Sequence, residues 1–160
     1  MNGTSANVFT PAGTVTRAQL VTILYRVAGE PETEFKATFS DVADGLWYSD
    51  AIEWAAANEV VNGVGEGKFN PMGAITREQI AAILYRYSKA AKVEGELKAF
   101  PDGDTASTYA IDALVWAVDE GLITGIKSGD VTKLAPKDNA TRAQIAAIIM
   151  RFLEGSFWCK

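Results

Sequence analysis

The stretch Val15-Thr16-Arg17-Ala18-Gln19-Leu20 decides the fold of this chain, because two further copies of it follow. These copies are Ile75-Thr76-Arg77-Glu78-Gln79-Ile80 and Ala140-Thr141-Arg142-Ala143-Gln144-Ile145. In each copy a threonine precedes a glutamine by three residues, which is the pattern of a capping box at a helix N-terminus. Apolar residues then recur at i, i+3 and i+4, so they share one helical face. The sequence therefore predicts the same helix start three times.

An arginine stands at the first helical position of each copy, as Arg17, Arg77 or Arg142. The helix dipole disfavours a cation at this position by roughly 0.3–1 kcal/mol. A residue that breaks a local rule three times suggests a role outside the helix. Beside the unpaired N–H groups of a helix start, an arginine would form a cationic pocket for a carboxylate or phosphate. The alternative is an internal ion pair with an Asp or Glu of the neighbouring repeat.

The composition places the chain among globular proteins, since 48% of its 160 residues are hydrophobic and 22% are charged. The net charge of −5 argues against nucleic acid as a partner. No apolar run is long enough to cross a bilayer, so we expect no membrane insertion. Histidine is absent and Cys159 is the only cysteine, which excludes His-based catalysis and the usual Cys/His metal sites. We expect neither a metal nor a cofactor.

The three copies belong to a longer repeat, because their threonines lie 60 and 65 residues apart. A period of this size is typical of architectures whose units bury their apolar faces against one another. Residues 36–91 and 97–155 form two full repeats, and residues 1–28 match only the second half of one. We expect a single domain over residues 1–155 with a tail at 156–160. We also expect an upstream segment of the parent protein to complete the first repeat.

The first half of each full repeat contains a helix, expected from about Asp50 to Asn58 in the second repeat. Trp54 and Trp116 fall in the middle of these helices and are expected in the core. Gly121 suits a helix C-cap, which needs a left-handed backbone. Glu59 occupies the matching position in the second repeat, where it would be less comfortable.

Glycines and an insertion mark the middle of each repeat. Gly63 and Gly125 suit a backbone that needs a positive φ or a close approach to another group. The third repeat has three extra residues between Gly125 and Leu134, which a loop would absorb at little cost.

The order of these motifs resembles the S-layer homology (SLH) repeat. It runs from Phe39-Ser40-Asp41-Val42 through Trp47, Gly63 and Phe69-Asn70-Pro71 to Thr76-Arg77-Glu78-Gln79. The third repeat matches with Tyr109 in place of the tryptophan and Leu134 in place of the phenylalanine. The resemblance implies an all-α fold, a pseudo-threefold assembly of helices with long loops between them.

The same resemblance implies a function. SLH domains anchor exported bacterial proteins non-covalently to the cell wall by binding secondary cell-wall polysaccharide in grooves between repeats. We therefore expect this chain outside the cell, at the cell surface. In several members of the family the polysaccharide carries a pyruvate ketal on an N-acetylmannosamine residue. The carboxylate of that group fits the anion pocket inferred from the arginines.

Four kinds of position match the family's ligand-binding residues. The arginines are Arg17, Arg77 and Arg142. The glycines that line the groove are Gly3, Gly63 and Gly125. The aspartates near the start of the repeat are Asp41 and Asp102, for which a loop or helix-capping hydrogen bond is the alternative. The groove aromatics are Trp47 and, as a departure from the family pattern, Tyr109.

Two other function classes are alternatives to anchoring. A protein-interaction or self-assembly module could use the same grooves for an acidic peptide. An enzyme could use a carboxylate pair such as Asp102 with Asp104, but no pair recurs between repeats as the arginines do. We therefore expect no enzymatic activity. The run Asp102-Gly103-Asp104 also hints at a calcium loop, but it lacks the later ligands of a full site.

Overall fold

The structure is a computed structural model that describes residue 5 and residues 8–155. Residues 1–4, 6–7 and 156–160 lie outside the described part, and with them the predicted site residue Gly3 and the predicted tail.

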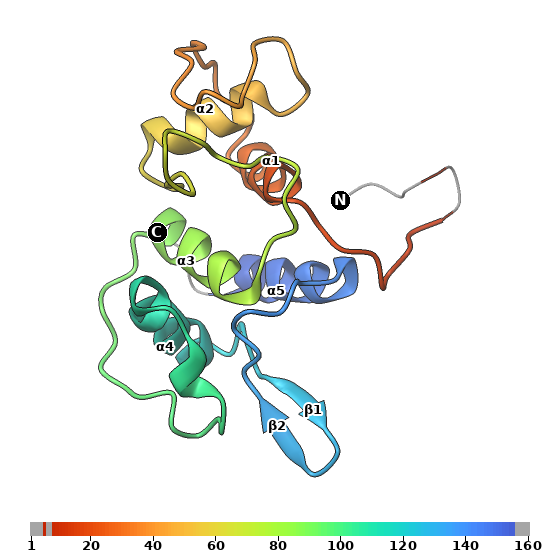
Figure 1. Cartoon of the computed structure of the whole chain (residues 1–160), viewed down its shortest axis with the longest axis vertical. Helices are drawn as coiled ribbons and strands as arrows, with labels where there is room; N and C mark the ends of the chain where they lie inside the picture. The colour runs from red at the N-terminus through yellow and green to blue at the C-terminus, as the bar shows by residue number, and fades with distance from the viewer. Residues whose placement is uncertain (1–4, 6–7, 156–160) are drawn as a thin grey trace. The chain divides into compact units, whose positions relative to one another are not determined.

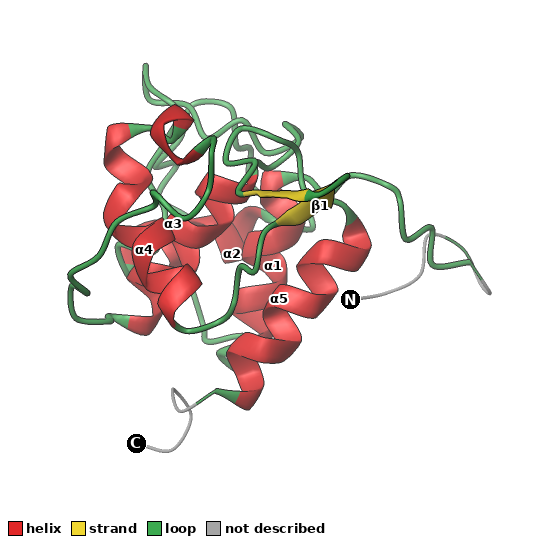
Figure 2. Ribbon diagram, turned by 90° about the horizontal axis from the view of Figure 1, so that it is seen from below, coloured by secondary structure: helices red, strands yellow, loops and turns green. Residues whose placement is uncertain are grey.

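Helices joined by long loops make up most of the regular structure (Figures 1 and 2). The described residues form α1 (Arg17–Val27), α2 (Ser49–Ala57), α3 (Arg77–Ser88), α4 (Ile111–Asp119) and α5 (Arg142–Glu154). Two short 3-10 helices, η1 (Gly103–Thr105) and η2 (Thr108–Ala110), precede α4. The described part of the chain is therefore mostly helical, as the sequence predicts, with one small sheet in addition.

The small sheet is formed around the insertion of the third repeat. Strands β1 (Ile126–Ser128) and β2 (Val131–Lys133) pair antiparallel, with Ser128 opposite Val131. Gly129 begins the turn between them with a φ of 63°, a value that glycine adopts without strain. The sequence predicts a loop for the inserted segment, with strands absent or limited to small loop pairings, and this loop closes on itself as a short hairpin (Figure 1).

All three predicted capping boxes form. In α1 the N–H of Gln19 donates to Oγ1 of Thr16 at 3.2 Å, and the N–H of Thr16 donates to Oε1 of Gln19 at 2.9 Å. The same reciprocal pair joins Thr76 to Gln79 in α3 and Thr141 to Gln144 in α5. These helix starts are therefore specified by residues only three positions apart.

One compact unit covers Val15–Ile75, and in it α1 packs against α2. Leu20 and Leu24 of α1 and Ile52 of α2 are fully buried. Burying a side chain of this kind stabilises the fold by about 1.5–3 kcal/mol. The ring of Tyr25 lies 5.6 Å from that of Trp54, which confirms the core position predicted for Trp54.

The second compact unit joins the described residues up to Thr14 with residues 76–155. Here α3 packs against α4, with Leu84 and Leu114 fully buried. Trp116 lies 5.5 Å from the ring of Tyr85 and 6.5 Å from that of Phe152, so its predicted core position is confirmed. The single domain over residues 1–155 and the threefold relation of the three arginine-led helices concern both units, and they stay predictions.

Candidate functional site

The three arginines lie buried at the starts of their helices. Arg17, Arg77 and Arg142 are 5%, 4% and 7% exposed. In each case Nε donates to a backbone carbonyl of a proline-containing loop. The acceptors are the carbonyls of Phe69 at 2.8 Å, Leu134 at 2.9 Å and Phe9 at 2.8 Å. Each arginine therefore binds a loop that belongs to another repeat.

The same loops also cap the helix starts. In α1 the N–H of Arg17 donates to the carbonyl of Gly73 and the N–H of Ala18 to that of Pro71, both at 2.9 Å. Equivalent bonds hold α3 through Asp138 and Pro136, and α5 through Gly13 and Pro11. The expectation of unpaired N–H groups beside the arginines is therefore wrong. A loop supplied from elsewhere in the chain satisfies those groups, so a ligand here would meet side chains rather than a bare helix start.

The proposed internal ion pair is not what holds Nε of the arginines, because these acceptors are carbonyls. The guanidinium of Arg17 also lies over the ring of Phe69, 4.5 Å from its centroid, and that of Arg142 lies 4.8 Å from the ring of Phe9. Each of these arginines is thus enclosed by a residue that also supplies its acceptor.

The aspartates hold the same loops from the other side. Asp41 accepts the N–H groups of Phe69 at 2.8 Å and Asn70 at 2.7 Å. Burial opposes ionisation of this carboxyl, but the two backbone bonds outweigh it and lower the pKa of Asp41 below its ordinary value. Asp102 repeats the arrangement with Leu134 and Ala135, both at 2.8 Å. The loop-holding alternative for the aspartates is therefore what the structure shows.

The residue that follows the arginine's carbonyl acceptor has a left-handed backbone in all three loops. Thr10, Asn70 and Ala135 each precede a proline and have φ values of 51°, 57° and 51°. Asparagine adopts this conformation more readily than threonine or alanine. The hydrogen bonds to arginine and aspartate therefore help to keep Ala135 in a backbone conformation that it does not favour by itself.

The two predicted glycines that the structure describes are required by close approach. A Cβ on Gly63 would lie 2.5 Å from the carbonyl oxygen of Lys68, which no side chain tolerates. Gly125 has a φ of 82°, and a Cβ there would lie 3.0 Å from the carbonyl oxygen of Lys133. Both glycines therefore bring the two ends of one loop together, just before the segment that the arginine and aspartate hold.

Trp47 and Tyr109, the predicted groove aromatics, are 58% and 55% exposed. Trp47 lies edge-on to Tyr48, with ring centroids 5.0 Å apart. The hydroxyl of Tyr109 donates to Oε1 of Glu78 at 3.3 Å. Both rings are thus accessible to a ligand, and Tyr109 is tied to the helix start that carries Arg77.

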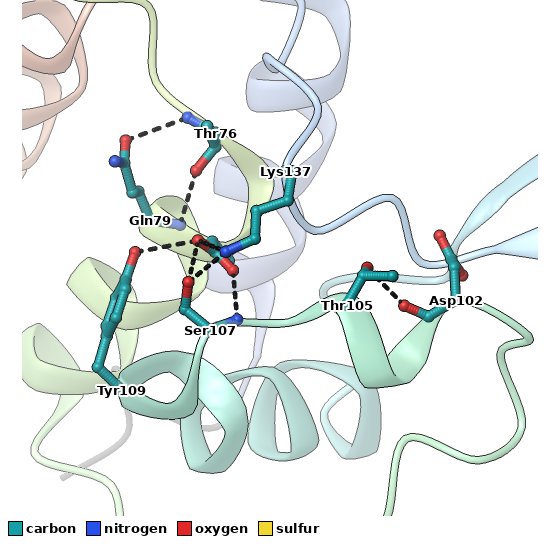
Figure 3. Close-up of polar contacts among 8 residues, drawn as sticks. Thr76, Gln79, Asp102, Thr105, Ser107, Tyr109 and Lys137 are labelled. Carbon is teal, nitrogen blue, oxygen red and sulfur yellow. Dashed lines mark hydrogen bonds and ion pairs between the residues drawn. The ribbon is translucent and has the colours of Figure 1, made fainter.

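Glu78 is the site residue that the sequence does not single out, and three of its partners, Ser107, Tyr109 and Lys137, are labelled in Figure 3. Its buried carboxylate accepts from the N–H of Ser107 at 2.9 Å, the hydroxyl of Ser107 at 3.0 Å and Nζ of Lys137 at 3.1 Å. Lys137 also donates to Oγ of Ser107. Burial opposes ionisation, but these donors outweigh it and lower the pKa of Glu78. The available signal was that the other two copies carry alanine at this position.

Arg17 and Arg77 differ in the hydrogen bonding of the guanidinium nitrogen Nη2. Nη2 of Arg17 donates to the carbonyl of Asn62 at 3.3 Å. Nη2 of Arg77 is enclosed and has no hydrogen-bond partner among the described residues. Burial lowers the pKa of Arg77, and the nearby charges of Asp138 and Asp102 oppose that effect. Arg77 therefore has a buried donor that no described residue satisfies.

The described part of the chain holds no group of three or more His, Cys, Asp or Glu side chains that could bind a metal ion. The run Asp102-Gly103-Asp104 therefore has no further acidic ligands for calcium among these residues. Within the same residues, no helix has the length and apolar character needed to span a membrane.

Taken together, these features define a helical repeat fold. An arginine holds each of the three loops. An aspartate joins it at two of them, and this pair is called the polar clasp: Arg17 with Asp41, and Arg77 with Asp102. The S-layer homology domain matches residues 38–81 and 99–146, more than half of the chain, and the chain belongs to this family. Membership places it at the bacterial cell surface, as the sequence predicts.

Three relatives illustrate the match. An amylopullulanase of Thermoanaerobacterium thermosulfurigenes is 33% identical over 98% of this chain and 8% of its own length. A surface-layer 125 kDa protein of Lysinibacillus sphaericus is 33% identical over 96% of this chain and 13% of its own. A cellulosome-anchoring protein of Acetivibrio thermocellus is 30% identical over 96% of this chain and 35% of its own length. The chain thus spans a small part of these proteins. The SLH domain is an anchoring module rather than a catalytic one, although some relatives that carry it are enzymes.

Proposed function

We propose that this chain anchors an exported protein non-covalently to the bacterial cell wall by binding a secondary cell-wall polysaccharide. The ligand we propose is an anionic, pyruvylated sugar. The binding residues are those matched by family position, in the grooves that Arg17, Arg77 and Arg142 mark. Membership of the SLH family supports the anchoring role, and the names of the surface-layer and cellulosome-anchoring relatives agree with it.

The observation that carries the ligand proposal is the unsatisfied Nη2 of Arg77. A buried donor without a partner costs about 1–3 kcal/mol, and more when the group is charged. An oxygen of a bound sugar would recover that free energy. Because the nitrogen is enclosed, a ligand that reaches it must displace the atoms that cover it.

The other residues divide into contacts and supports. Trp47 and Tyr109 offer exposed aromatic faces, which suit the apolar side of a sugar ring. Asp41 and Asp102 act by fixing the loop whose carbonyl the arginine binds, because their carboxylates already accept two backbone N–H groups each. Gly63 and Gly125 let that loop close.

Sedimentation with purified cell walls tests the proposal. The chain is expected to bind intact walls and to lose binding after hydrofluoric acid has extracted the secondary polymer. Retention on extracted walls would contradict the polysaccharide and support peptidoglycan or a protein partner, the alternative interaction module.

Arginine variants test the site itself. A hydrogen bond to a charged group contributes about 1.5–3 kcal/mol, so Arg77→Gln should weaken one groove by roughly ten- to a hundredfold. Arg86→Gln is the matched control, because Arg86 lies in the last turn of the same helix. Thermal unfolding of both variants separates lost binding from lost structure. Equal wall affinity of a folded Arg77→Gln, Arg142→Gln protein and the unchanged chain would contradict the role of the arginines.

A further inference from the structure

Three side chains bind the buried carboxylate of Glu78, and only one of them is needed to hold a loop. The N–H of Ser107 donates to Oε2 of Glu78 at 2.9 Å, and its hydroxyl donates to Oε1 at 3.0 Å. Glu53 accepts from the N–H and the hydroxyl of Thr38 in the same way, and among the described residues no cation pairs with it. The bonds to Ser107 therefore account for a structural role, whereas the lysine and the tyrosine bound to Glu78 need another explanation.

Lys137 and Glu78 occur together at the start of α3 and are both absent from the start of α1. The carbonyl of Pro136 caps the α3 start, and Lys137 follows this proline, whereas Met72 follows the proline that caps α1. The residue after the arginine is Glu78 in α3 but Ala18 in α1. The lysine is thus found where the chain also has the glutamate that binds it.

The ion pair of Glu78 and Lys137 has its positive end at the surface. The Glu78 side chain is 5% exposed, and the Lys137 side chain is 53% exposed. The pair is neutral as a whole, but a ligand that approaches from solvent meets the ammonium before the carboxylate. An ammonium has three N–H donors, and the acceptors it has among the described residues are Glu78 and Ser107. One N–H of Lys137 therefore remains for an anion.

These two bonds hold the ammonium in place before any ligand binds. A surface lysine loses side-chain entropy when it binds an anion, which is one reason why exposed ion pairs contribute little. Lys137 has a buried partner, so part of this entropy is already lost in the folded chain. Lys98 differs, because its partner Glu96 is itself 66% exposed. Lys137 is therefore better prepared to bind an anion than an ordinary surface lysine.

Tyr109 adds an aromatic face beside this ammonium. Its hydroxyl donates to Oε1 of Glu78 at 3.3 Å, and Nζ of Lys137 donates to the same oxygen at 3.1 Å (Figure 3). The hydroxyl and the ammonium can thus be no farther apart than these two bonds allow, which is a distance that one sugar unit spans. The Tyr109 side chain is exposed, and an aromatic ring suits the apolar side of a sugar.

We infer that Lys137 and Tyr109 form a binding subsite in which the ammonium binds the carboxylate of an acidic sugar and the ring contacts its apolar face. Glu78 and Ser107 are positioning residues, because they act through Lys137. The inference rests on the proposed function and deepens it, since it names a further residue that contacts the carboxylate. Arg77 keeps its proposed role of binding an oxygen of the sugar.

Titration with two defined sugars, followed by NMR, tests the subsite. The probes are methyl N-acetylmannosaminide and its 4,6-pyruvate ketal, of which only the ketal carries a carboxylate. The readout is the backbone N–H resonance of Ser107, which is bonded to Glu78. The N–H of Thr38, bonded to Glu53, is the reference that should not shift. The Ser107 resonance should report an affinity for the ketal about three- to tenfold higher than for the neutral sugar.

Substitution of Lys137 separates binding of the carboxylate from a structural role. Lys137→Gln should weaken binding of the ketal about three- to tenfold and leave the neutral sugar within about twofold. Lys137→Arg keeps the charge and should retain most of the affinity for the ketal. The effect of Lys137→Gln should shrink at about 0.5 M salt, because salt screens a half-exposed cation. Lys98→Gln is the matched control, since it removes a lysine from an exposed ion pair.

The other outcomes contradict the inference or the proposed function. If Lys137→Gln weakens both sugars alike, or weakens neither, Lys137 does not bind the carboxylate and the inference is wrong. The proposed function stands in that case, provided that the unchanged chain binds the ketal. Failure of the unchanged chain to bind the ketal at all would overturn the proposed function itself.

Discussion

Arg77 and Asp102 hold Leu134 from opposite sides. Nε of Arg77 donates to the carbonyl of Leu134 at 2.9 Å, and the N–H of Leu134 donates to Oδ1 of Asp102 at 2.8 Å. Arg17 and Asp41 hold Phe69 in the same way. One backbone residue is therefore fixed at both of its polar groups by side chains from two different repeats.

The clasp on Leu134 should contribute to stability. Asp102→Asn is expected to lower the free energy of unfolding by about 1–3 kcal/mol, because one of the two backbone N–H groups that it holds loses its charged acceptor. Arg77→Ala should cost a similar amount, because the carbonyl of Leu134 then loses its charged donor. Urea unfolding measures both values.

Asp104→Asn is the control for this experiment, since Asp104 is exposed and should change stability by less than about 0.5 kcal/mol. The losses of unfolding free energy caused by Asp102→Asn and by Arg77→Ala should be non-additive, because both side chains bind the backbone of Leu134. If the double variant loses the sum of the two single losses in unfolding free energy, Arg77 and Asp102 do not stabilise the loop cooperatively.

The carboxylates should make the fold sensitive to acid. The pKa of Asp102 is lowered in the folded state from its ordinary 3.8, because the two backbone bonds outweigh burial. A lowered pKa stabilises the fold above the unfolded value, and that stabilisation is lost as pH falls through the folded one. We expect the melting temperature to fall as pH drops below 3.8, with Glu78 contributing in the same sense from its ordinary 4.5 downward.

Thermal scans between about pH 2 and 7 measure this dependence. The difference in melting temperature between the unchanged chain and Asp102→Asn should be largest at neutral pH and should shrink in acid. A constant difference across that range would mean that the ionised carboxylate does not stabilise the clasp.

Glu59 should be a weak point that substitution can repair. It has a φ of 59° just after α2, where the third repeat has Gly121 with a φ of 67°. A left-handed residue with a Cβ costs about 1–2 kcal/mol, part of which glycine loses again through its greater freedom in the unfolded chain. Glu59→Gly should therefore stabilise the chain by about 0.5–1 kcal/mol in urea unfolding. Gly121→Ala should do the opposite, and a destabilised Glu59→Gly protein would contradict this account.

Several features could be predicted because their causes are local. The capping boxes depend on residues three positions apart, and the core positions of Trp54 and Trp116 follow from helical periodicity. The unfavourable backbone of Glu59 was expected from its alignment with Gly121 alone. The order of the motifs was enough to assign the family.

The predictions from sequence failed where the hydrogen-bond partner is distant in the sequence. The acceptors of Arg17, Arg77 and Arg142 lie 52, 57 and 133 residues away from them in the sequence. The loops that satisfy the helix starts come from similar distances, so the sequence left those N–H groups apparently free. Glu78 was passed over for the same reason, because its donors lie on two other segments of the chain.

The sequence by itself determined where helices begin, which residues face the core and which family the chain belongs to, because propensity and periodicity act within a few residues. The tertiary structure alone decided which carbonyl each arginine binds and that the aspartates hold loops. It also decided that Nη2 of Arg77 lacks the carbonyl partner, among the residues described, that Asn62 supplies to Arg17. Burial and hydrogen bonding at these positions depend on which distant segment closes over the side chain. No local pattern encodes that choice.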